Sequence, residues 1–411
     1  MSPSTPAARV PGVVFLLAAV IFCLGTSEFM IAGILELIAA DLGVSIPEAG
    51  LLITAFAVGM IVGAPGMALL TLGLPRKPTL IITAVIFAAA HVLGALAQGY
   101  ALLALSRVVA AVACGGFWAV AAVVAVRVTP PQATGRALAA LVGGLTVANL
   151  IGVPLGAWVG TQYGWRATFW GVAAVTALAA VLIALTVPAE PRPADAPRVG
   201  QVLAAETRAF RHGRIWVALA TTALFQAAVF ASFSYFAPLL IRVSGLAPDR
   251  VPLVLVGFGV GALIGVTVGG RLADRNLFGN LIGSLVSLAA ALALLWLVAP
   301  FWPAAVAAVA LVGATGFSIA GALNARVFQI ATSAPTLAAS MNTAAFNVGN
   351  ALGPALGGAV IALGLGFRAP LLVGIALALG ALALVRYAMA RDGVSLRRAT
   401  ARASGGNPRS R

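Results

Sequence analysis

The sequence predicts an all-α integral membrane protein whose chain crosses the bilayer twelve times. Two observations lead to this prediction. First, 62% of the 411 residues are hydrophobic and only 9% are charged, whereas a soluble globular domain is about 45–50% apolar and about 25% charged. Second, the apolar residues gather in long runs, and a membrane-spanning helix needs about 20 such residues. A water-soluble core cannot enclose this much apolar surface, so the solvent must be lipid.

Clusters of Gly, Pro or charged residues separate the apolar runs. Small residues inside the runs fit close helix packing in lipid. The first run is too long for the apolar region of a signal peptide, and Arg9 is its only positive flank, so we interpret it as the first span. The predicted spans cover residues 12–38, 49–72, 79–98, 101–126, 136–160, 166–187, 215–241, 251–270, 280–299, 303–329, 336–364 and 369–390.

The positive charges are distributed unevenly between the two sides of the membrane. In a soluble protein a net charge of +15 would suggest a nucleic-acid partner, but here the charges sort by loop. If the N-terminus is cytoplasmic, the cytoplasmic segments hold twenty Lys and Arg residues and the outer segments hold four. The positive-inside rule then predicts a multi-pass protein of the cell inner (plasma) membrane with both termini in the cytoplasm. No nucleic-acid partner is predicted.

The longest loop divides the chain into two halves. Residues 1–187 are expected to form an N-terminal six-helix bundle, and residues 215–411 a C-terminal six-helix bundle with a basic cytoplasmic tail. Residues 188–214 form the predicted cytoplasmic linker, which opens with Pro-Ala-Glu-Pro-Arg-Pro and continues with a short basic helix on the membrane surface.

The two halves repeat each other. Asn149–Gly156 matches Asn350–Gly357 at an offset of 201 residues, and Gly164–Ala167 matches Gly366–Ala369 at an offset of 202. Six spans is an even number, so both halves enter the membrane in the same orientation. Parallel repeats of this kind are typical of transporters that bind substrate between their halves near the membrane midplane.

A loop signature after the eighth span suggests a family. The run Gly270-Arg-Leu-Ala-Asp-Arg275 resembles the cytoplasmic loop signature of the major facilitator superfamily. The loop after the second span has the expected basic pair but Leu72 at the acidic position and Pro75 at the final glycine. An Asp near a helix N-terminus and an adjacent Arg can form a breakable ionic latch between bundles. The alternative is ordinary positive-inside loop charge. The predicted latch residues are Arg76, Lys77, Asp274 and Arg275.

The fifth and eleventh spans resemble the glycine-proline antiporter signature of the exporters in this superfamily. The match is closer in the eleventh span, because Val153-Pro154 replaces Gly-Pro in the fifth. Such a helix packs tightly and bends at proline, although generic helix packing explains the same pattern. The predicted antiporter-type residues are Asn149, Gly152, Pro154, Gly156, Gly353 and Pro354.

The first span narrows the resemblance to one group of exporters. Gly25-Thr-Ser-Glu-Phe-Met30, residues 51–65 and Phe117-Trp-Ala119 are similar to bacterial drug exporters, most of all the actinobacterial chloramphenicol resistance proteins. One departure is Glu36, which stands where the family pattern has proline. The resemblance implies the major facilitator fold and a proton-coupled antiporter that exports a small neutral aromatic antibiotic, with chloramphenicol the first candidate. It also implies a monomer without cofactors.

Three ionisable residues within the spans are the candidates for proton coupling: Glu28, Arg107 and Glu36. A buried carboxylate is costly when ionised, so proton uptake removes that cost. A charged residue in mid-span costs about 2.5–3.5 kcal/mol on insertion scales, and such residues usually have a function. Three alternatives stay open: Arg107 snorkels to the interface, Glu36 is solvated near the outer surface, and Glu28 only bonds a neighbouring helix.

Aromatic and amide side chains in the spans are the candidates for substrate binding. Helix–helix hydrogen bonding is the alternative explanation for many of them. His91, in the third span, is interpreted as a packed or interfacial residue rather than a proton relay. The predicted substrate-binding residues are Trp118, Phe225, Gln226, Phe233, Tyr235, Asn324, Phe346 and Asn347.

Several other functions lack the residues that they require. The two cysteines, Cys23 and Cys114, lie within spans and form no metal-ligand pattern, and no nucleotide-binding motif occurs. Few acids in the spans argue against export of polycations. The alternatives are efflux of a sugar or another metabolite and, in another class, a channel or an intramembrane enzyme. A channel would need a continuous polar stripe, and an enzyme would need a cluster of catalytic side chains.

Overall fold

The computed structural model describes residues 10–189, 200, 213–331 and 335–393, and these residues are helical apart from their connections. They include twelve helical segments long and apolar enough to cross a membrane, which confirms the predicted number of spans. Most of the predicted linker, with its surface helix, and most of the basic tail lie outside the described residues. Nine spans are single long helices: α1 (Gly12–Leu42), α2 (Ile46–Leu70), α3 (Arg76–Ala95), α4 (Tyr100–Val128), α7 (Trp165–Thr186), α11 (Val251–Arg275), α12 (Leu277–Val298), α15 (Pro335–Ala362) and α16 (Ala369–Arg391).

Three spans that the sequence presents as continuous are interrupted. In the fifth span, Pro154 has no N–H for the carbonyl four residues earlier, and a π-helical turn precedes it. The other two interruptions fall at Ser234-Tyr235 and Ser318-Ile319. The pieces are α5 (Thr134–Val147), η3 (Ala148–Gly152) and α6 (Val153–Tyr163) in span five, α9 (Gly213–Phe233) and α10 (Phe236–Arg242) in span seven, and α13 (Trp302–Phe317) and α14 (Ala320–Ile330) in span ten. Three-residue 3₁₀ turns adjoin α2, α5 and α11: η1 (Thr71–Gly73), η2 (Pro131–Ala133) and η5 (Pro248–Arg250).

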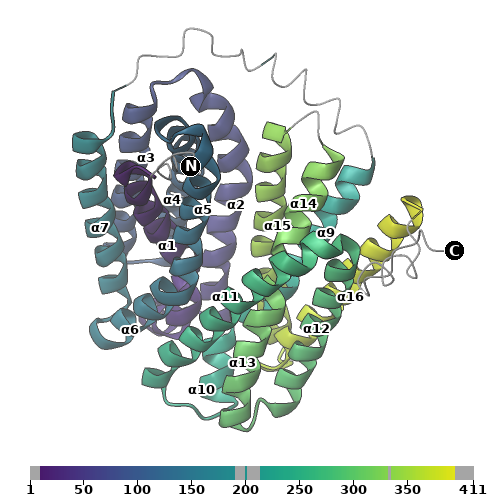
Figure 1. Cartoon of the computed structure of the whole chain (residues 1–411). Helices are drawn as coiled ribbons and strands as arrows, with labels where there is room; N and C mark the ends of the chain where they lie inside the picture. The colour runs from purple at the N-terminus through teal and green to yellow at the C-terminus, as the bar shows by residue number, and fades with distance from the viewer. Residues whose placement is uncertain (1–9, 190–199, 201–212, 332–334, 394–411) are drawn as a thin grey trace, which may run out of the picture.

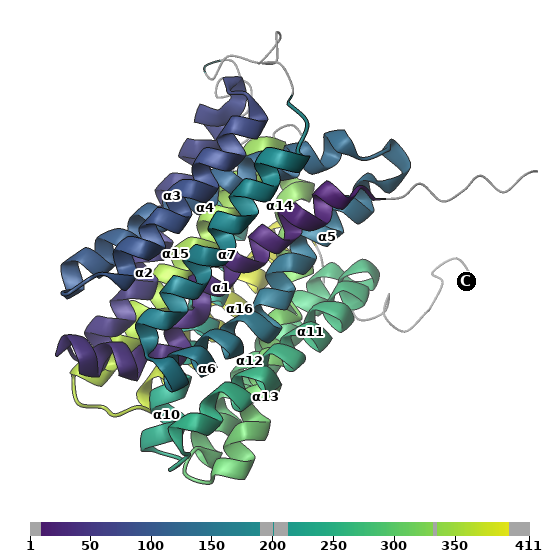
Figure 2. The same cartoon turned by 90° about the vertical axis from the view of Figure 1, so that its left-hand side faces the viewer.

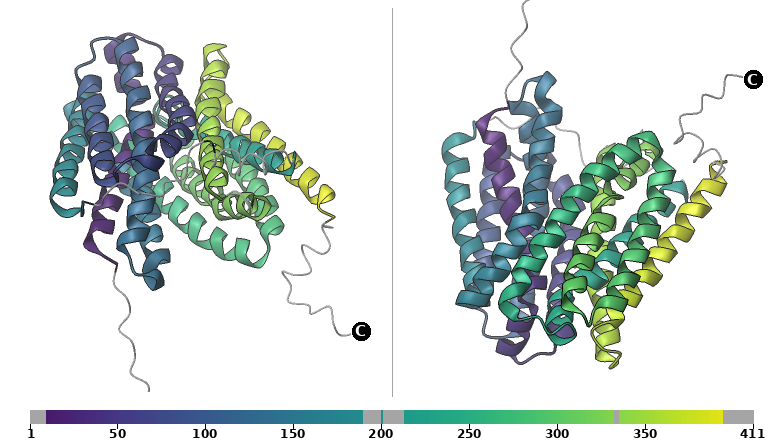
Figure 3. Two further views of the ribbon diagram at one scale, coloured as in Figure 1. Left: turned by 90° about the horizontal axis from the view of Figure 1, so that it is seen from above. Right: turned by 60° about the horizontal axis from the view of Figure 1, so that its bottom comes forward.

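The helices form two bundles, α1–α7 and α9–α16, which stand side by side (Figure 1). We call the end where α1 and α9 begin and α16 ends the upper end, and the opposite end the lower end (Figure 1). The bundles meet where α2 packs along α15, where α11 crosses η3 and α6, and where α1 contacts α10. Views from the side and from above and below show the long helices of each bundle running together between the two ends (Figures 2 and 3).

Glycines of the fifth span allow it to lie directly on α1. A Cβ added to Gly144 would lie 2.3 Å from the Ala18 carbonyl oxygen, and one on Gly160 would lie 2.5 Å from the Ile34 side chain. Between them, Gly152 faces Thr26 in the same register. The partners are 126 residues apart at every level, as expected for two parallel helices in contact. Small residues permit this approach in lipid.

The same register recurs in the C-terminal bundle between α9 and α15. Added Cβ atoms on Gly349, Gly353 and Gly357 would lie 2.6, 2.8 and 2.8 Å from the carbonyl oxygens of Ala223, Ala227 and Ala231. These partners are again 126 residues apart. The repeat found in the sequence is therefore also a repeat of helix packing.

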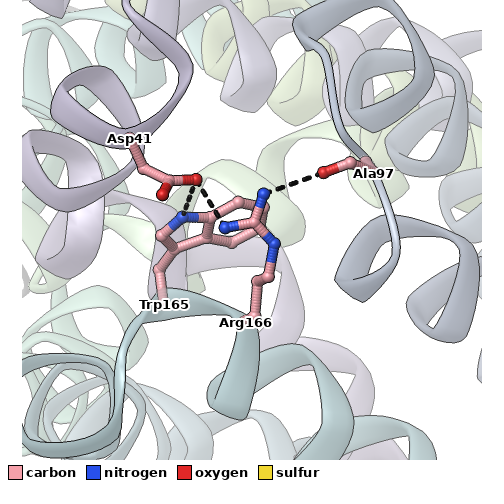
Figure 4. A network of polar contacts seen from close by, with 4 residues as sticks. All are labelled: Asp41, Ala97, Trp165 and Arg166. Carbon is pink, nitrogen blue, oxygen red and sulfur yellow. Dashed lines mark hydrogen bonds and ion pairs between the residues drawn. The ribbon is translucent and has the colours of Figure 1, made fainter.

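Polar contacts at the lower end tie the N-terminal bundle together (Figure 4). Asp41 at the end of α1 accepts hydrogen bonds from the Trp165 indole at 3.1 Å and from Arg166. Arg166 also donates to the Ala97 carbonyl oxygen at 3.0 Å. Its counterpart in the second half, Arg368, donates to the Trp296 carbonyl oxygen. The repeated Gly-aromatic-Arg-Ala motif thus anchors the sixth span of each half to the end of the third.

The connection between α1 and α2 is short and well defined. Gly43 adopts φ +64°, a left-handed conformation that glycine tolerates, and ends α1. The Ser45 hydroxyl accepts from the Glu48 N–H at 3.3 Å, and the Glu48 carboxylate accepts from the Ser45 N–H at 2.7 Å. This capping box starts α2.

Candidate functional site

Glu28 lies in α1 at the junction of the two bundles and is half-buried. The Asn350 amide of α15 donates a hydrogen bond to Glu28 Oε1 at 3.1 Å. Gln226 of α9 donates in turn to Asn350 Oδ1 at 2.8 Å, and Asn347 lies beside Asn350. A chain of amides from the C-terminal bundle thus ends on a carboxylate of the N-terminal bundle.

Aromatic rings pack beside this polar chain. The rings of Phe29 and Phe230 meet across the junction, with centroids 5.1 Å apart. Phe230 contacts Phe233, which lies 4.8 Å from Phe258 in α11. The junction therefore places one carboxylate, several amides and a cluster of phenyl rings close together.

Arg107 of α4 is fully buried, with 0% of its surface exposed. Its terminal nitrogens donate to the Ser27 hydroxyl at 2.9 Å and to the Ser27 carbonyl oxygen at 2.7 Å. The guanidinium lies over the Phe56 ring, 4.5 Å from the centroid. Arg107 therefore neither snorkels to the surface nor lines an open cavity in this conformation. It is held at the residue that directly precedes Glu28.

Sequence reasoning did not select two residues of this network, Ser27 and His91. His91 of α3 is buried, and its Nε2 lies 2.6 Å from the Ser27 hydroxyl oxygen. The only available signal was the presence of polar residues inside apolar runs, one of them adjacent to Glu28. Asn350 was visible as a polar residue of the eleventh span, but its bond to Glu28 depends on how the bundles meet.

Glu36 lies apart from this network, towards the lower end of α1. Its carboxylate pairs with Arg242 at the end of α10 at 2.8 Å, and the Arg242 guanidinium lies 5.2 Å from the centre of the Phe367 ring. Both charged side chains retain access to solvent. The pair connects the two bundles at the lower end, and none of its hydrogen bonds or ion pairs joins it to the Glu28 network.

The predicted substrate-binding residues divide into three groups. Phe225, Phe233, Tyr235 and Asn347 are buried among other side chains, and Tyr235 donates its hydroxyl hydrogen to the Pro354 carbonyl oxygen. Asn324 is exposed and accepts a hydrogen bond from Asn342. The partly exposed members are Trp118, Gln226 and Phe346.

The predicted latch residues do not form an ion pair with one another. Asp274 and Arg275, at the upper end of α11, are both exposed, and Asp274 forms no salt bridge with another described residue. Arg76 and Lys77, at the start of α3, are partly exposed. An ionic latch at this position is not closed in this conformation.

The glycines among the antiporter-type residues lie at close helix–helix contacts in both halves. Gly152 and Gly353 are contact points of the registers described above, and a Cβ on Gly156 would lie 3.2 Å from Met30 Cβ in the same register as Gly152. Asn149 donates to the Leu145 carbonyl oxygen at 3.1 Å. Pro154 follows the π-helical turn, whereas Pro354 lies within the continuous α15. A Cβ on Gly259 of α11 would lie 2.6 Å from Leu150 Cα, so the fifth span also forms part of the junction between bundles.

The site offers little for metal binding. No group of three or more His, Cys, Asp or Glu side chains that could hold a metal ion occurs in the part of the chain that the structure describes. Cys23 and Cys114 are both buried and unpaired with each other.

Twelve spans in two repeated bundles, with a polar network at their junction, define a membrane transport protein. The family model for the Major Facilitator Superfamily matches residues 17–335. The chain therefore belongs to the major facilitator superfamily. It is a transporter and not an enzyme.

Similar proteins agree with this assignment. A Streptomyces lividans protein named "Chloramphenicol resistance protein" is 41% identical over 83% of this chain and 86% of its own. "Inner membrane transport protein YdhP" of Escherichia coli strain K12 is 40% identical over 84% of this chain and 88% of its own. "Probable sugar efflux transporter" of Helicobacter pylori strain G27 is 31% identical over 91% and 94%.

Among solved structures, a bacterial homolog of the human lysosomal transporter Spinster, described as inward-facing and unoccupied, shares the fold. Its TM-score is 0.74 at 18% identity, covering 94% of this chain and 97% of that chain.

Proposed function

We propose that the protein is a proton-coupled antiporter of the inner (plasma) membrane that exports a small neutral aromatic antibiotic, most simply chloramphenicol. In this proposal the upper end of the bundles, with both termini, faces the cytoplasm. The observation that carries the proposal is the bond between Glu28 and Asn350, which joins a carboxylate of one bundle to the other bundle.

Protonation of Glu28 changes the strength of this connection between bundles. An ionised carboxylate accepts a charge-assisted hydrogen bond, which is roughly twice as strong as a neutral one. Ionised Glu28 therefore favours the conformation described here, in which Asn350 reaches it. A proton that binds Glu28 weakens this preference and shifts the population towards another arrangement of the bundles.

The proton gradient is large enough for such export. One proton that enters across 100 mV releases about 2.3 kcal/mol. Since about 1.4 kcal/mol corresponds to a tenfold ratio, this energy supports a roughly fiftyfold gradient of a neutral drug.

The substrate class follows from the side chains at the junction and from one relative. Phenyl rings and amides favour a neutral aromatic ligand with polar substituents. Among the described residues, Glu28 is the one carboxylate bonded to these amides, and a single acid does not favour a polycation. The name of the Streptomyces lividans relative points to chloramphenicol. Efflux of a sugar is the second candidate, because the amides Gln226, Asn347 and Asn350 can also bind hydroxyl groups, and the Helicobacter pylori relative carries that name.

Transport by the purified protein in proteoliposomes tests the proposal. An imposed pH gradient should drive accumulation of labelled chloramphenicol, and unlabelled drug should exchange with it. Uptake of a sugar without uptake of chloramphenicol would establish the second candidate instead. Equal uptake with and without the pH gradient would contradict proton coupling.

A further inference from the structure

The hydrogen-bond directions around His91 are determined by its partners. His91 Nδ1 lies 2.8 Å from the Phe87 carbonyl oxygen, which can only accept, so Nδ1 carries the hydrogen. The other ring nitrogen, Nε2, lies 2.6 Å from the Ser27 hydroxyl oxygen. In neutral imidazole Nε2 is then an acceptor.

The Ser27 hydroxyl completes this chain of bonds. Arg107 can only donate, so the Ser27 oxygen accepts from Arg107 at 2.9 Å. The hydroxyl hydrogen is left to point at His91 Nε2. Arg107 thus donates to Ser27, Ser27 donates to His91, and His91 donates to Phe87, so each of these bonds joins one donor to one acceptor.

A doubly protonated His91 does not fit the same chain. Its Nε2–H would be a second donor to the Ser27 oxygen, and the Ser27 hydrogen would lose its acceptor. It would also place a second cation beside Arg107, the charged group that faces His91. The Phe87 and Phe169 rings pack against the imidazole, with centroids 4.3 and 5.7 Å away, and no carboxylate among the described residues forms a hydrogen bond or ion pair with it.

We propose that Ser27 and His91 form a positioning pair that holds the Arg107 guanidinium next to Glu28, with His91 acting as a fixed neutral acceptor rather than as a proton carrier. The proposal rests on the proposed proton-coupled function of Glu28. Ser27 is one peptide unit from Glu28, and it receives both terminal nitrogens of Arg107. Any rotation of Ser27 therefore moves the cation relative to the carboxylate.

Two substitutions of His91 distinguish its role as a hydrogen-bond acceptor from the packing of its ring. In His91→Gln the side-chain oxygen can accept from Ser27, and the residue has no group that titrates. In His91→Phe the ring volume between Phe87 and Phe169 is kept, but the acceptor is lost. Ser27→Ala removes the hydroxyl and leaves the bond from Arg107 to the backbone carbonyl.

The transport measurement uses pH-driven uptake of labelled chloramphenicol by the folded variants in proteoliposomes. His91→Gln should lose less than about tenfold, the effect of one hydrogen bond, and keep the pH dependence of the wild type. His91→Phe should lose about a hundredfold, the effect expected when a reacting group is misplaced by about 1 Å, and Ser27→Ala should lie between them. A His91→Gln protein as inactive as His91→Phe, with both eluting as folded monodisperse protein, would overturn the proposal.

A second measurement does not depend on any substrate. His91 and His212 are the two histidines of the chain, so ¹⁵N-histidine labelling of a His212→Gln protein in proteoliposomes reports on His91 alone. The Nδ1-protonated neutral form should persist across about pH 5 to 8, where an ordinary imidazole changes charge. Conversion to imidazolium in that range would overturn the proposal. Failure of the wild type to transport chloramphenicol would contradict the proposed function and leave this spectrum to decide the role of His91.

Discussion

The two bundles share one packing scheme but differ in their buried polar chemistry. The contact of Gly152 with Thr26 recurs, at the offset of 201 residues, as the contact of Gly353 with Ala227. At the same offset, however, Glu28 corresponds to Val229 and Arg107 corresponds to Ala308. The two halves therefore share their helix contacts, while Glu28 and the fully buried Arg107 have no charged counterpart at the equivalent positions of the C-terminal bundle.

The same comparison extends to the positioning pair. Ser27 corresponds to Ala228 and His91 to Leu292, and both of these apolar residues are buried. The C-terminal bundle instead contributes amides and a row of packed rings, listed from one contact to the next as Phe230, Phe233, Phe236, Phe258 and Phe317. In the proposed function this difference becomes a division of labour, in which the N-terminal bundle carries the proton on Glu28 and the C-terminal bundle supplies groups that bind the ligand.

The largest effect is expected for Arg107→Ala. This change removes the buried cation held at Ser27, with the two hydrogen bonds that it donates to the Ser27 hydroxyl and carbonyl oxygens. We expect pH-driven uptake to fall by about a hundredfold or more, while the protein remains in the membrane. Ala308→Ser, at the corresponding place in the other bundle, is the matched control and should transport normally. Normal drug resistance in cells that express Arg107→Ala would contradict a role for the charge.

Glu28→Gln should separate drug binding from proton coupling. The glutamine oxygen can still accept from Asn350, but the side chain no longer titrates. Exchange of labelled for unlabelled drug should therefore persist, whereas accumulation driven by a pH gradient should be lost. Val229→Gln in the other bundle tests whether a polar residue at the equivalent depth has the same effect. Full pH-driven accumulation by Glu28→Gln would show that the acid is structural.

Gly353→Ala should destabilise the protein more than Gly152→Ala. A Cβ at Gly353 meets backbone atoms, Ala231 N at 2.7 Å and the Ala227 oxygen at 2.8 Å, whereas at Gly152 the closest atom is the Thr26 hydroxyl oxygen, which can rotate away. Overpacking of this kind typically costs about 1–3 kcal/mol. Thermal unfolding in detergent should therefore show a lower midpoint for the Gly353 variant. The opposite order would contradict the idea that a clash with backbone atoms costs more than a clash with a side chain that can rotate.

The smallest effect is expected for Glu36→Gln. The ion pair of Glu36 with Arg242 is accessible to solvent, and exposed pairs contribute about 0–1 kcal/mol. Transport should change by less than about fivefold, and most of the proton drive should remain. Arg242→Gln should reduce transport by a similar factor, and the double variant should transport as fast as either single variant. Loss of pH-driven uptake in Glu36→Gln alone would place a second proton site at the lower end.

Hydropathy alone was sufficient to predict the twelve spans, because each must satisfy its backbone groups inside a helix and present apolar side chains to lipid. The repeat was also visible, since Asn149–Gly156 and Asn350–Gly357 keep the small residues that close packing requires. The interruptions of spans seven and ten were not visible, because Ser234 and Ser318 are compatible with a continuous helix and the break depends on neighbouring contacts.

The identity of the unusual residues came from the sequence, whereas their partners came only from the tertiary structure. Glu28, Arg107 and Glu36 stand out because charge is rare in a span. That Arg107 binds Ser27, that Glu28 meets Asn350 more than 300 residues away, and that Glu36 pairs with Arg242 depends on how the helices rotate and how the bundles meet. Composition and periodicity record how much apolar surface a helix has, but many different pairings of helices bury that surface equally well, and only the packed structure selects one of them.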